Sequence, residues 1–137
     1  MNLNNLIVKD CMIDINSSPV VKSQQILKEA INQMETHKIG IVNVIDENFK
    51  LIGVITDGDL RRTLLREQKP LAALLVEDVD KYIKKSPLTI FDNDLLINSI
   101  NLMNEKKIWD LPVINDQNNL VGLLHLHTAI KKYLNLK

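Results

Sequence analysis

The chain has 137 residues, which is long enough for one domain with a hydrophobic core or for two small halves that share one, and too short for two independent enzymatic domains. Its 17 basic and 17 acidic residues give a formal net charge of zero, which excludes a global electrostatic attraction to nucleic acid or to an acidic membrane surface. The single cysteine, Cys11, excludes an internal disulfide and a zinc site made only of cysteines from one chain.

Targeting signals and membrane-spanning segments are not found in the sequence. No apolar stretch approaches the roughly 18 residues that a membrane-spanning helix needs, and the N-terminus lacks the basic and apolar regions of a signal peptide. Because a lone cysteine also suits a reducing compartment, we expect a soluble, cytoplasmic protein. Only 4% of the residues are aromatic, so we expect a core of Ile, Leu, Val and Met.

The first half of the chain predicts a strand, a helix, a hairpin and a second helix. Pro19 begins a short extended segment, because proline fixes its own φ and biases its neighbour toward extended geometry. Apolar residues then recur at helical spacing and predict a helix that carries Ile26, Leu27, Ala30, Ile31 and Met34. Two apolar runs, 41–45 and 51–55, flank a polar turn and predict a hairpin. The closing helix carries Leu60, Leu64 and Leu65.

The second half repeats these elements at a distance of 69 residues. The segment 38–56 matches 107–125 at Lys, Ile, Val, Leu and Gly positions, and the helices before them match as well. The segment around 68–78 is typical of a linker. The sequence therefore predicts an α/β (α+β) fold of two β-α-β-β-α repeats, which are residues 1–68 and, with the linker, residues 69–137.

Each half is too small to be stable alone. At about 60 residues it cannot bury enough apolar surface, so we expect the two repeats to pack sheet to sheet about a pseudo-twofold axis. Ligands of α/β units bind in crevices at strand ends, and we therefore expect a ligand in a cleft between the repeats.

The most informative stretch is GVITDGDLRRTL, residues 53–64, where a predicted strand runs directly into a predicted helix. This junction would place the Thr56 hydroxyl beside the unpaired N–H groups of a helix N-terminus, which favours a phosphate group. The Asp59 carboxylate suits the two hydroxyls of a ribose, and Arg62 could reach a phosphate. The alternative is that Asp59 only caps the helix and that the arginines only face solvent, although capping does not exclude binding.

The repeat and the pattern Gly-hydrophobic-hydrophobic-Thr-x-x-Asp, present at residues 53–59, resemble a tandem pair of cystathionine-β-synthase (CBS) domains, or Bateman module. The strings GVITDGDLRRTL and LVGLLHLH are most similar to the regulatory pair of arabinose-5-phosphate isomerases. Similar pairs precede the catalytic domain of some sugar-phosphate nucleotidyltransferases. The resemblance extends over almost the whole chain, and it implies a homodimer that controls an attached or separate sugar-phosphate-metabolising enzyme.

The resemblance also implies a ligand site. In nucleotide-binding CBS pairs, the matching Thr and Asp contact phosphate and ribose, and an apolar strand segment lines the base pocket. The corresponding candidates in this chain are Thr56, Asp57, Asp59 and Arg62 at the junction, and Val42, Val44 and Pro112 on the strands. We expect an adenine or cytidine nucleotide or a sugar nucleotide as the effector, and no other cofactor.

The second half departs from the pattern, because His125 stands in place of the Thr and Thr128 in place of the Asp. The carboxylate for a ribose is missing there, so we expect His125 and His127 to contact a phosphate or sugar acid, or to be hydrogen-bonded at the cleft. Two histidines at this spacing share one face of a strand and could also chelate zinc. Only His37 and Cys11 remain as further ligands, so no metal site is predicted.

Two further candidate residues lie where the second hairpin begins. Trp109 suits the core or a dimer interface. Pro112 suggests a strand edge exposed to the cleft, because proline cannot donate a ladder hydrogen bond.

No catalytic constellation is recognised, since the sequence offers no nucleophile with an assigned base and no phosphate loop. The sequence thus predicts a non-catalytic regulatory module that binds a nucleotide or sugar nucleotide and transmits occupancy by a change in packing. A purely structural dimerisation module without a ligand is the alternative, and an enzyme with a site around His125 and His127 is a third interpretation. The initial Met favours a module that precedes a catalytic domain or that stands as a small protein.

Overall fold

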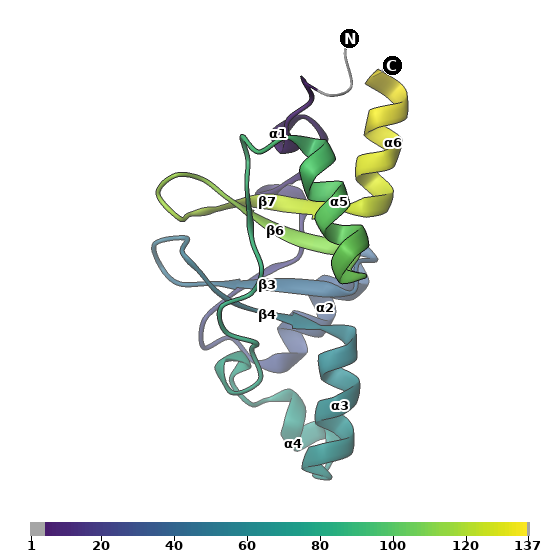
Figure 1. Ribbon diagram of the computed structural model, residues 1–137. Helices are drawn as coiled ribbons and strands as arrows, with labels where there is room; N and C mark the ends of the chain where they lie inside the picture. Colours follow the sequence, from purple (N-terminus) through teal and green to yellow (C-terminus); the bar gives the residue numbers. More distant parts are fainter. Residues whose placement is uncertain (1–4, 137) are drawn as a thin grey trace. The chain divides into compact units, whose positions relative to one another are not determined.

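The computed structural model describes residues 5–136, and Figure 1 shows their helices and strands. The chain divides into two units, of which unit 2 is the continuous stretch Pro19–Pro87. Unit 1 combines the described residues before Pro19 with those from Leu88 onward. The units differ from the sequence repeats because the short segment before each repeat's proline pairs with a strand of the other repeat: Ile13 pairs with Leu123, and Lys84 pairs with Val54.

Unit 2 is built on a three-stranded sheet in the order β2-β3-β4, with β2 parallel to β3 and β3 antiparallel to β4. The turn between β3 and β4 is held by Asp46, which accepts hydrogen bonds from the backbone N–H groups of Asn48 and Lys50. The strands are β2 Val20–Lys22, β3 Ile41–Ile45 and β4 Leu51–Thr56. The helices are α2 Leu27–His37, α3 Asp57–Glu67 and α4 Leu71–Leu75, followed by the 3₁₀ helix η3 Val79–Lys81.

Unit 1 has a four-stranded sheet in the order β1-β7-β6-β5. Its hairpin turn repeats that of unit 2, because Asn115 accepts from the backbone N–H groups of Gln117 and Asn119. The strands are β1 Ile13–Asp14, β5 Ile90–Phe91, β6 Asp110–Ile114 and β7 Leu120–His125. The helices are α1 Val8–Cys11, α5 Leu96–Lys106 and α6 Leu126–Leu136, with the 3₁₀ helix η2 at Ile15–Ser17.

The sequence repeat is visible in the backbone. The helices α2 and α5 both end in a left-handed residue, Lys38 and Lys107, each with φ of 56°. The turns of the two hairpins contain a left-handed residue at matching places, Phe49 with φ of 64° and Asn118 with φ of 63°. The predicted β-α-β-β-α order is therefore confirmed in both halves.

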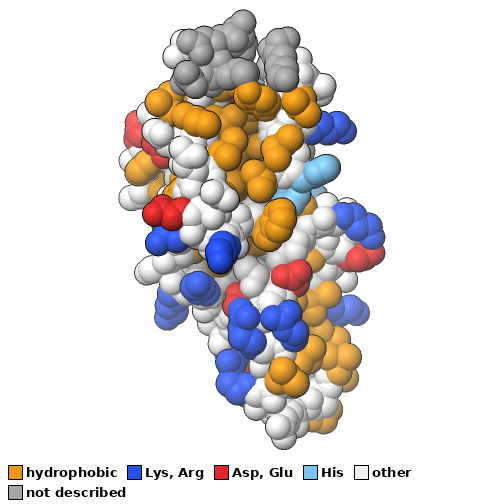
Figure 2. All heavy atoms as spheres, turned by 45° about the vertical axis from the view of Figure 1, so that its right-hand side comes forward, with side chains coloured by type: hydrophobic (Ala, Val, Ile, Leu, Met, Phe, Trp, Pro, Cys, Tyr) orange, Lys and Arg blue, Asp and Glu red, His pale blue; other side chains and the backbone are white. Residues whose placement is uncertain are grey.

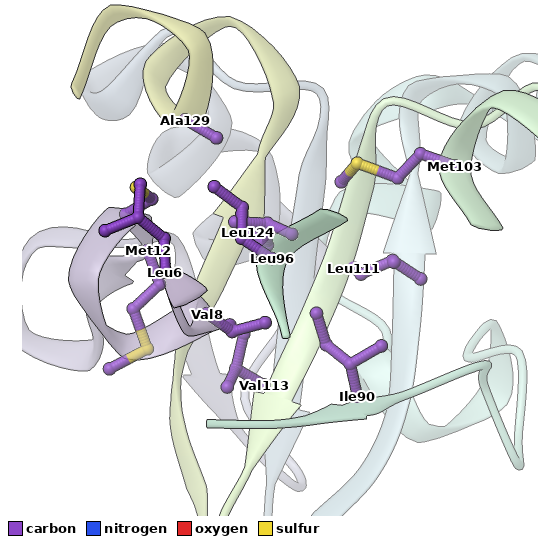
Figure 3. Packing of buried hydrophobic residues seen from close by; sticks show 11 residues of the cluster. Leu6, Val8, Met12, Ile90, Leu96, Met103, Leu111, Val113, Leu124 and Ala129 are labelled. Atoms are coloured by element: carbon purple, nitrogen blue, oxygen red, sulfur yellow. The ribbon is translucent and has the colours of Figure 1, made fainter. Parts of the chain in front are cut away.

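Each unit has its own aliphatic core. Figure 3 shows side chains of the unit 1 core from its strands, helices and N-terminal segment, among them Val8, Met103, Leu111, Leu124 and Ala129. The unit 2 core consists of Val21, Leu27, Ala30, Val42, Val44, Ile55, Leu74 and Val79. Since burying one such large aliphatic side chain contributes about 1.5–3 kcal/mol, these clusters are what hold the sheets and helices together.

The structure differs from the sequence-based expectation at the linker and at Pro112. Part of the predicted linker forms α4, because the run Leu71–Leu75 consists of strong helix formers and follows Pro70, which suits a helix start. The expected edge position of Pro112 is wrong, since β6 lies between β7 and β5 and Pro112 is buried. Its missing N–H is accommodated because β5 pairs with β6 only from Val113 onward, whereas β2 pairs with β3 already from the matching Asn43.

None of the helices between residues 5 and 136 combines the length and the hydrophobicity that crossing a membrane requires.

Candidate functional site

The junction between β4 and α3 is held by a capping box. Thr56 ends β4, and its Oγ1 accepts a hydrogen bond of 3.0 Å from the backbone N–H of Asp59. In return, Oδ2 of Asp59 accepts a hydrogen bond of 3.0 Å from the backbone N–H of Thr56. The two side chains thus fix each other's rotamers, and the strand passes into the helix without a loop.

The second carboxylate oxygen of Asp59 binds Arg62, whose Nη2 lies 2.6 Å from Oδ1. Burial disfavours the charged form of Asp59, but the hydrogen bonds from Arg62 and Thr56 outweigh it, so the pKa of Asp59 lies below its ordinary value of 3.8. The side chain of Asp59 is 22% exposed and that of Arg62 is 59% exposed. Asp59 is therefore a fixed, ionised and still accessible carboxylate beside an exposed guanidinium.

The backbone N–H groups of the first turn of α3 all have partners within the protein. The N–H of Asp57 donates to Gly40 O at 2.9 Å, and the N–H of Gly58 donates to Asp57 Oδ1 at 2.8 Å. The third N–H, of Asp59, is bound by Thr56. Donors for an anion at this junction are consequently side chains rather than the helix N-terminus.

Asp57 serves the backbone of the junction. Its Oδ2 lies only 2.7 Å from where a Cβ of Gly40 would be, so any larger residue at position 40 would collide with it. The sequence predicts Asp57 as a ligand contact. In the structure its side chain packs against Gly40 and accepts a hydrogen bond from the N–H of Gly58.

A concave surface of about 440 Å³ opens beside Asp59. One wall is α3, and the other is the segment 81–84, whose Lys84 makes a two-way backbone hydrogen bond with Val54 of β4, at 2.8 and 3.1 Å. The residues that line it are Asp59, Arg62, Thr63, Arg66, Lys81, Tyr82, Ile83 and Lys84. Sequence reasoning missed Lys81 and Lys84, because only the fold brings the segment 81–84 next to α3. It also missed Arg66, although its place four residues after Arg62 on the predicted helix was a usable signal.

The strand candidates of unit 2 lie in its core. Val42 and Val44 have no exposed surface and pack with Val21, Ile55 and Ala30. Because residues two apart on a strand share a face, both valines point to the helix-covered side of the sheet. The structure does not bring them together with Asp59 in the concave surface that Asp59 lines.

The second junction, between β7 and α6, contains a histidine–carboxylate pair. Nδ1 of His125 lies 2.6 Å from Oδ1 of Asp110, and the two residues are directly opposite each other on β7 and β6. Both side chains are mostly buried, with 22% and 14% exposed. Sequence reasoning did not single out Asp110, although its place directly before the apolar run 111–114 was a usable signal.

His127 does not share a strand face with His125, so that part of the sequence interpretation is wrong. The strand ends at His125, and after one more hydrogen bond, from the N–H of Leu126 to Trp109 O at 2.9 Å, the chain continues as α6. His127 consequently lies on the helix and is exposed. Within residues 5–136, no group of three or more His, Cys, Asp or Glu side chains is placed to hold a metal ion.

Unit 1 also has an apolar groove between α5 and α6, with a volume of about 640 Å³. Trp109 lines it and is 70% exposed, so it is not a core residue. On α6, Ile130 in the groove and Leu134 one turn later are 45% and 53% exposed. These three side chains form the apolar surface that we call the Trp109 face.

The architecture of two β-α-β-β-α repeats, each with a strand that runs into a helix, now allows a comparison with known proteins. The family described as CBS domain matches residues 8–66 and again residues 76–135. This chain belongs to the CBS domain family. It contains two copies of the domain in tandem, so the resemblance noted in the sequence is confirmed.

Similar proteins include sugar-phosphate isomerases and a nucleotide-bound CBS pair. Arabinose 5-phosphate isomerase KdsD of Francisella tularensis is 29% identical over 124 residues, which are 90% of this chain and 36% of that protein. A protein of Haemophilus influenzae named "Probable arabinose 5-phosphate isomerase" is 35% identical over 96 residues, 70% of this chain and 27% of that protein. The chain thus spans about a third of the length of the curated relatives it matches.

A solved structure shares both the fold and part of the sequence. This is the crystal structure of the CBS-pair protein CBSX2 of Arabidopsis thaliana in complex with AMP. It is 28% identical, with a TM-score of 0.81 and coverage of 95% of this chain and 97% of that chain.

Proposed function

We propose that this CBS pair is a non-catalytic regulatory module that binds an adenine nucleotide at the β4–α3 junction of unit 2. The observation that carries the proposal is the capping box, which fixes the Asp59 carboxylate at the end of β4 while leaving it accessible. A carboxylate in this position can accept the hydroxyls of a ribose, and the adjacent Arg62 favours a phosphate. The AMP complex of the similar protein CBSX2 supports an adenine nucleotide.

The partners that Asp59 already has do not block this role. Each carboxylate oxygen has two lone pairs, and the structure gives each oxygen one partner, Thr56 N–H on one and Arg62 on the other. A ribose can therefore bind beside them, and Arg62, which is bound to the same carboxylate, would be available to the phosphate.

The experiment is a calorimetric titration of the whole protein with AMP. Separate titrations with CMP and UMP test whether another base is preferred. In Asp59→Asn, which keeps the shape of the cap, we expect AMP affinity to fall by about 1.5–3 kcal/mol because charged hydrogen bonds are lost. The matched control is Glu35→Gln, since Glu35 is an exposed carboxylate paired only with Lys38 on the surface. Equal AMP affinity in all three proteins, or no binding of any nucleotide, would contradict the proposal.

A homodimer is the second part of the proposal, and the Trp109 face supports it. Its tryptophan and its two α6 residues, one turn apart, form an apolar stripe of the type that two identical helices bury across a twofold axis. Tryptophan is also enriched at the centres of protein interfaces. Sedimentation of the wild-type protein and of Trp109→Ala tests this, since a wild-type monomer would contradict it and a weakened dimer in the variant would support it.

We also propose that the regulated enzyme acts on a sugar phosphate. The support is that two relatives are named as arabinose 5-phosphate isomerases, of which this chain matches about a third or less. The reading frame around this segment tests the link. An isomerase or nucleotidyltransferase domain in the same or the neighbouring frame would support it, and unrelated neighbours would count against it.

A further inference from the structure

We infer that the concave surface between α3 and residues 81–84 binds an oligophosphate, and that it selects nucleotides with a di- or triphosphate chain over AMP. The inference rests on the proposed nucleotide site, because Asp59 lines the same surface and would place the ribose at its edge. Its lining includes four cationic side chains and one carboxylate. Figure 2 shows Lys and Arg side chains gathered around Asp or Glu side chains below the centre of the view.

The cations are held on fixed backbone. Arg62 and Arg66 lie four residues apart on α3, so they share one face of the helix. Lys84 is joined to β4 by its two hydrogen bonds with Val54, two residues before the capping threonine. Lys81 ends η3, which is anchored by the buried Val79 and its N–H bond of 2.8 Å to Gln25 O. The charges therefore face one another without a cost of ordering the main chain.

The positive charge of this surface is only partly neutralised by the protein. Arg62 is paired with Asp59, and Lys81 lies 3.6 Å from Glu77, which also binds Lys69 at 2.8 Å. For Arg66 and Lys84 the structure describes no carboxylate partner between residues 5 and 136. Cations crowded in this way repel one another, and a polyanion relieves the repulsion while gaining charge-assisted hydrogen bonds.

The chemistry of the surface favours phosphate groups. Guanidinium groups bind phosphate oxygens through paired N–H donors, and lysine ammonium groups bind them as point charges. The first-turn N–H groups of α3 are occupied, so the side chains are the donors that remain. A ribose on Asp59 directs its phosphate chain along α3, and each further phosphate then meets another cation. AMP, with one phosphate, would leave most of these cations unused.

The experiment measures the affinities of adenosine, AMP, ATP and free tripolyphosphate for the whole protein by calorimetry. The test variant is Arg66→Gln/Lys84→Gln, and the control is Lys28→Gln/Lys131→Gln, which removes two exposed lysines outside this surface. Both variants change exposed side chains, and unchanged melting temperatures without ligand show that they fold.

We expect the wild type to bind ATP more tightly than AMP. We expect the test variant to lose at least about tenfold in affinity for ATP and tripolyphosphate while its affinity for adenosine is unchanged. The affinity of the test variant for ATP should also depend less on salt concentration, because two charge interactions that salt screens are removed. The control variant should behave as the wild type.

Two results separate this inference from the proposed function. If adenosine and AMP bind through Asp59 but ATP binds no more tightly than AMP, or the test variant retains full ATP affinity, the oligophosphate site is overturned and the nucleotide site stands. If tripolyphosphate binds and requires Arg66 and Lys84 while no nucleoside binds, the proposed function fails and the oligophosphate site stands.

Discussion

In unit 2, β4 enters α3 through Thr56, and in unit 1, β7 enters α6 through His125, 69 residues later. The backbone of the two junctions is the same. The first N–H of each helix donates to a carbonyl at the start of the hairpin at 2.9 Å, from Asp57 to Gly40 O and from Leu126 to Trp109 O. The side chains at these matching positions are polar or absent in unit 2 and apolar in unit 1.

The difference teaches how one backbone supports two kinds of surface. In unit 2, Gly40 leaves room for Asp57, and α3 presents arginines beside a carboxylate. In unit 1, Trp109 occupies the place of Gly40, and the neighbouring groove is apolar. The matching helix position to Thr63 is Lys132, whose Nζ donates to Met12 O at 2.6 Å and so is used within unit 1. The same backbone thus carries a charged surface in unit 2 and an apolar one in unit 1.

The largest expected effect concerns the matching glycines of β7 and β4. A Cβ at Gly122 would lie 2.4 Å from Ile13 O, whereas at Gly53 it would lie 2.9 Å from Lys84 O. Both contacts are with backbone, which yields poorly, so Gly122→Ala should lower the free energy of unfolding by about 3 kcal/mol and Gly53→Ala by about 1–2 kcal/mol. Urea denaturation of both variants checks this. A larger loss of stability in Gly53→Ala than in Gly122→Ala would show that the segments around Ile13 and Lys84 do not pack against β7 and β4 as described.

A smaller effect is expected at the capping box. Thr56→Val keeps the size of the side chain but removes the acceptor for Asp59 N–H, which should cost about 1 kcal/mol of stability. The control in unit 1 is the same substitution in the first turn of α6, Thr128→Val, at the position that matches Asp59. The structure describes no side-chain hydrogen bond of Thr128, so this change should cost much less. Equal losses in the two variants would mean that the two helix starts do not differ as the structure shows.

The smallest effect concerns the contribution of Glu77 to the stability of unit 2 at low pH. Lys69, and after it Tyr82, donate hydrogen bonds to Glu77 and lower its pKa from the ordinary 4.5 to about 2. Because the folded pKa lies below the unfolded one, this stabilisation is complete above about pH 4.5 and is lost as the pH falls toward 2. In Glu77→Gln, the free energy of unfolding should therefore fall less steeply over this range. Identical pH profiles for the variant and the wild type would rule the effect out.

Much of the fold could be predicted because its signals are local. Turn residues and apolar periodicity mark the hairpins and helices, and the 69-residue repeat supplies each assignment twice. The pairing of His125 with Asp110 could not be predicted in this way. Counting outward from the turn places Asp110 opposite Leu124, and only the bulge between Val113 and Ile114 shifts the register by one residue.

The candidate site could be predicted only in part from the sequence, because some of its residues are far apart in the chain. Thr56 and Asp59 form a local motif, and their capping box follows from their spacing. The cations of residues 81–84 reach α3 because Lys84 pairs with Val54, a contact between residues far apart in the chain. No local pattern encodes that contact, so the basic surface is visible only in the folded protein.

The most direct test of the central claim is an NMR titration of the ¹⁵N-labelled protein with AMP, in which the amide signals of both junctions are monitored. If the nucleotide binds at the β4–α3 junction, the amide signals of residues 56–60 will shift in a saturable manner and those of residues 125–129 will not. Saturable shifts confined to residues 125–129, or no shifts at either junction, would contradict the account.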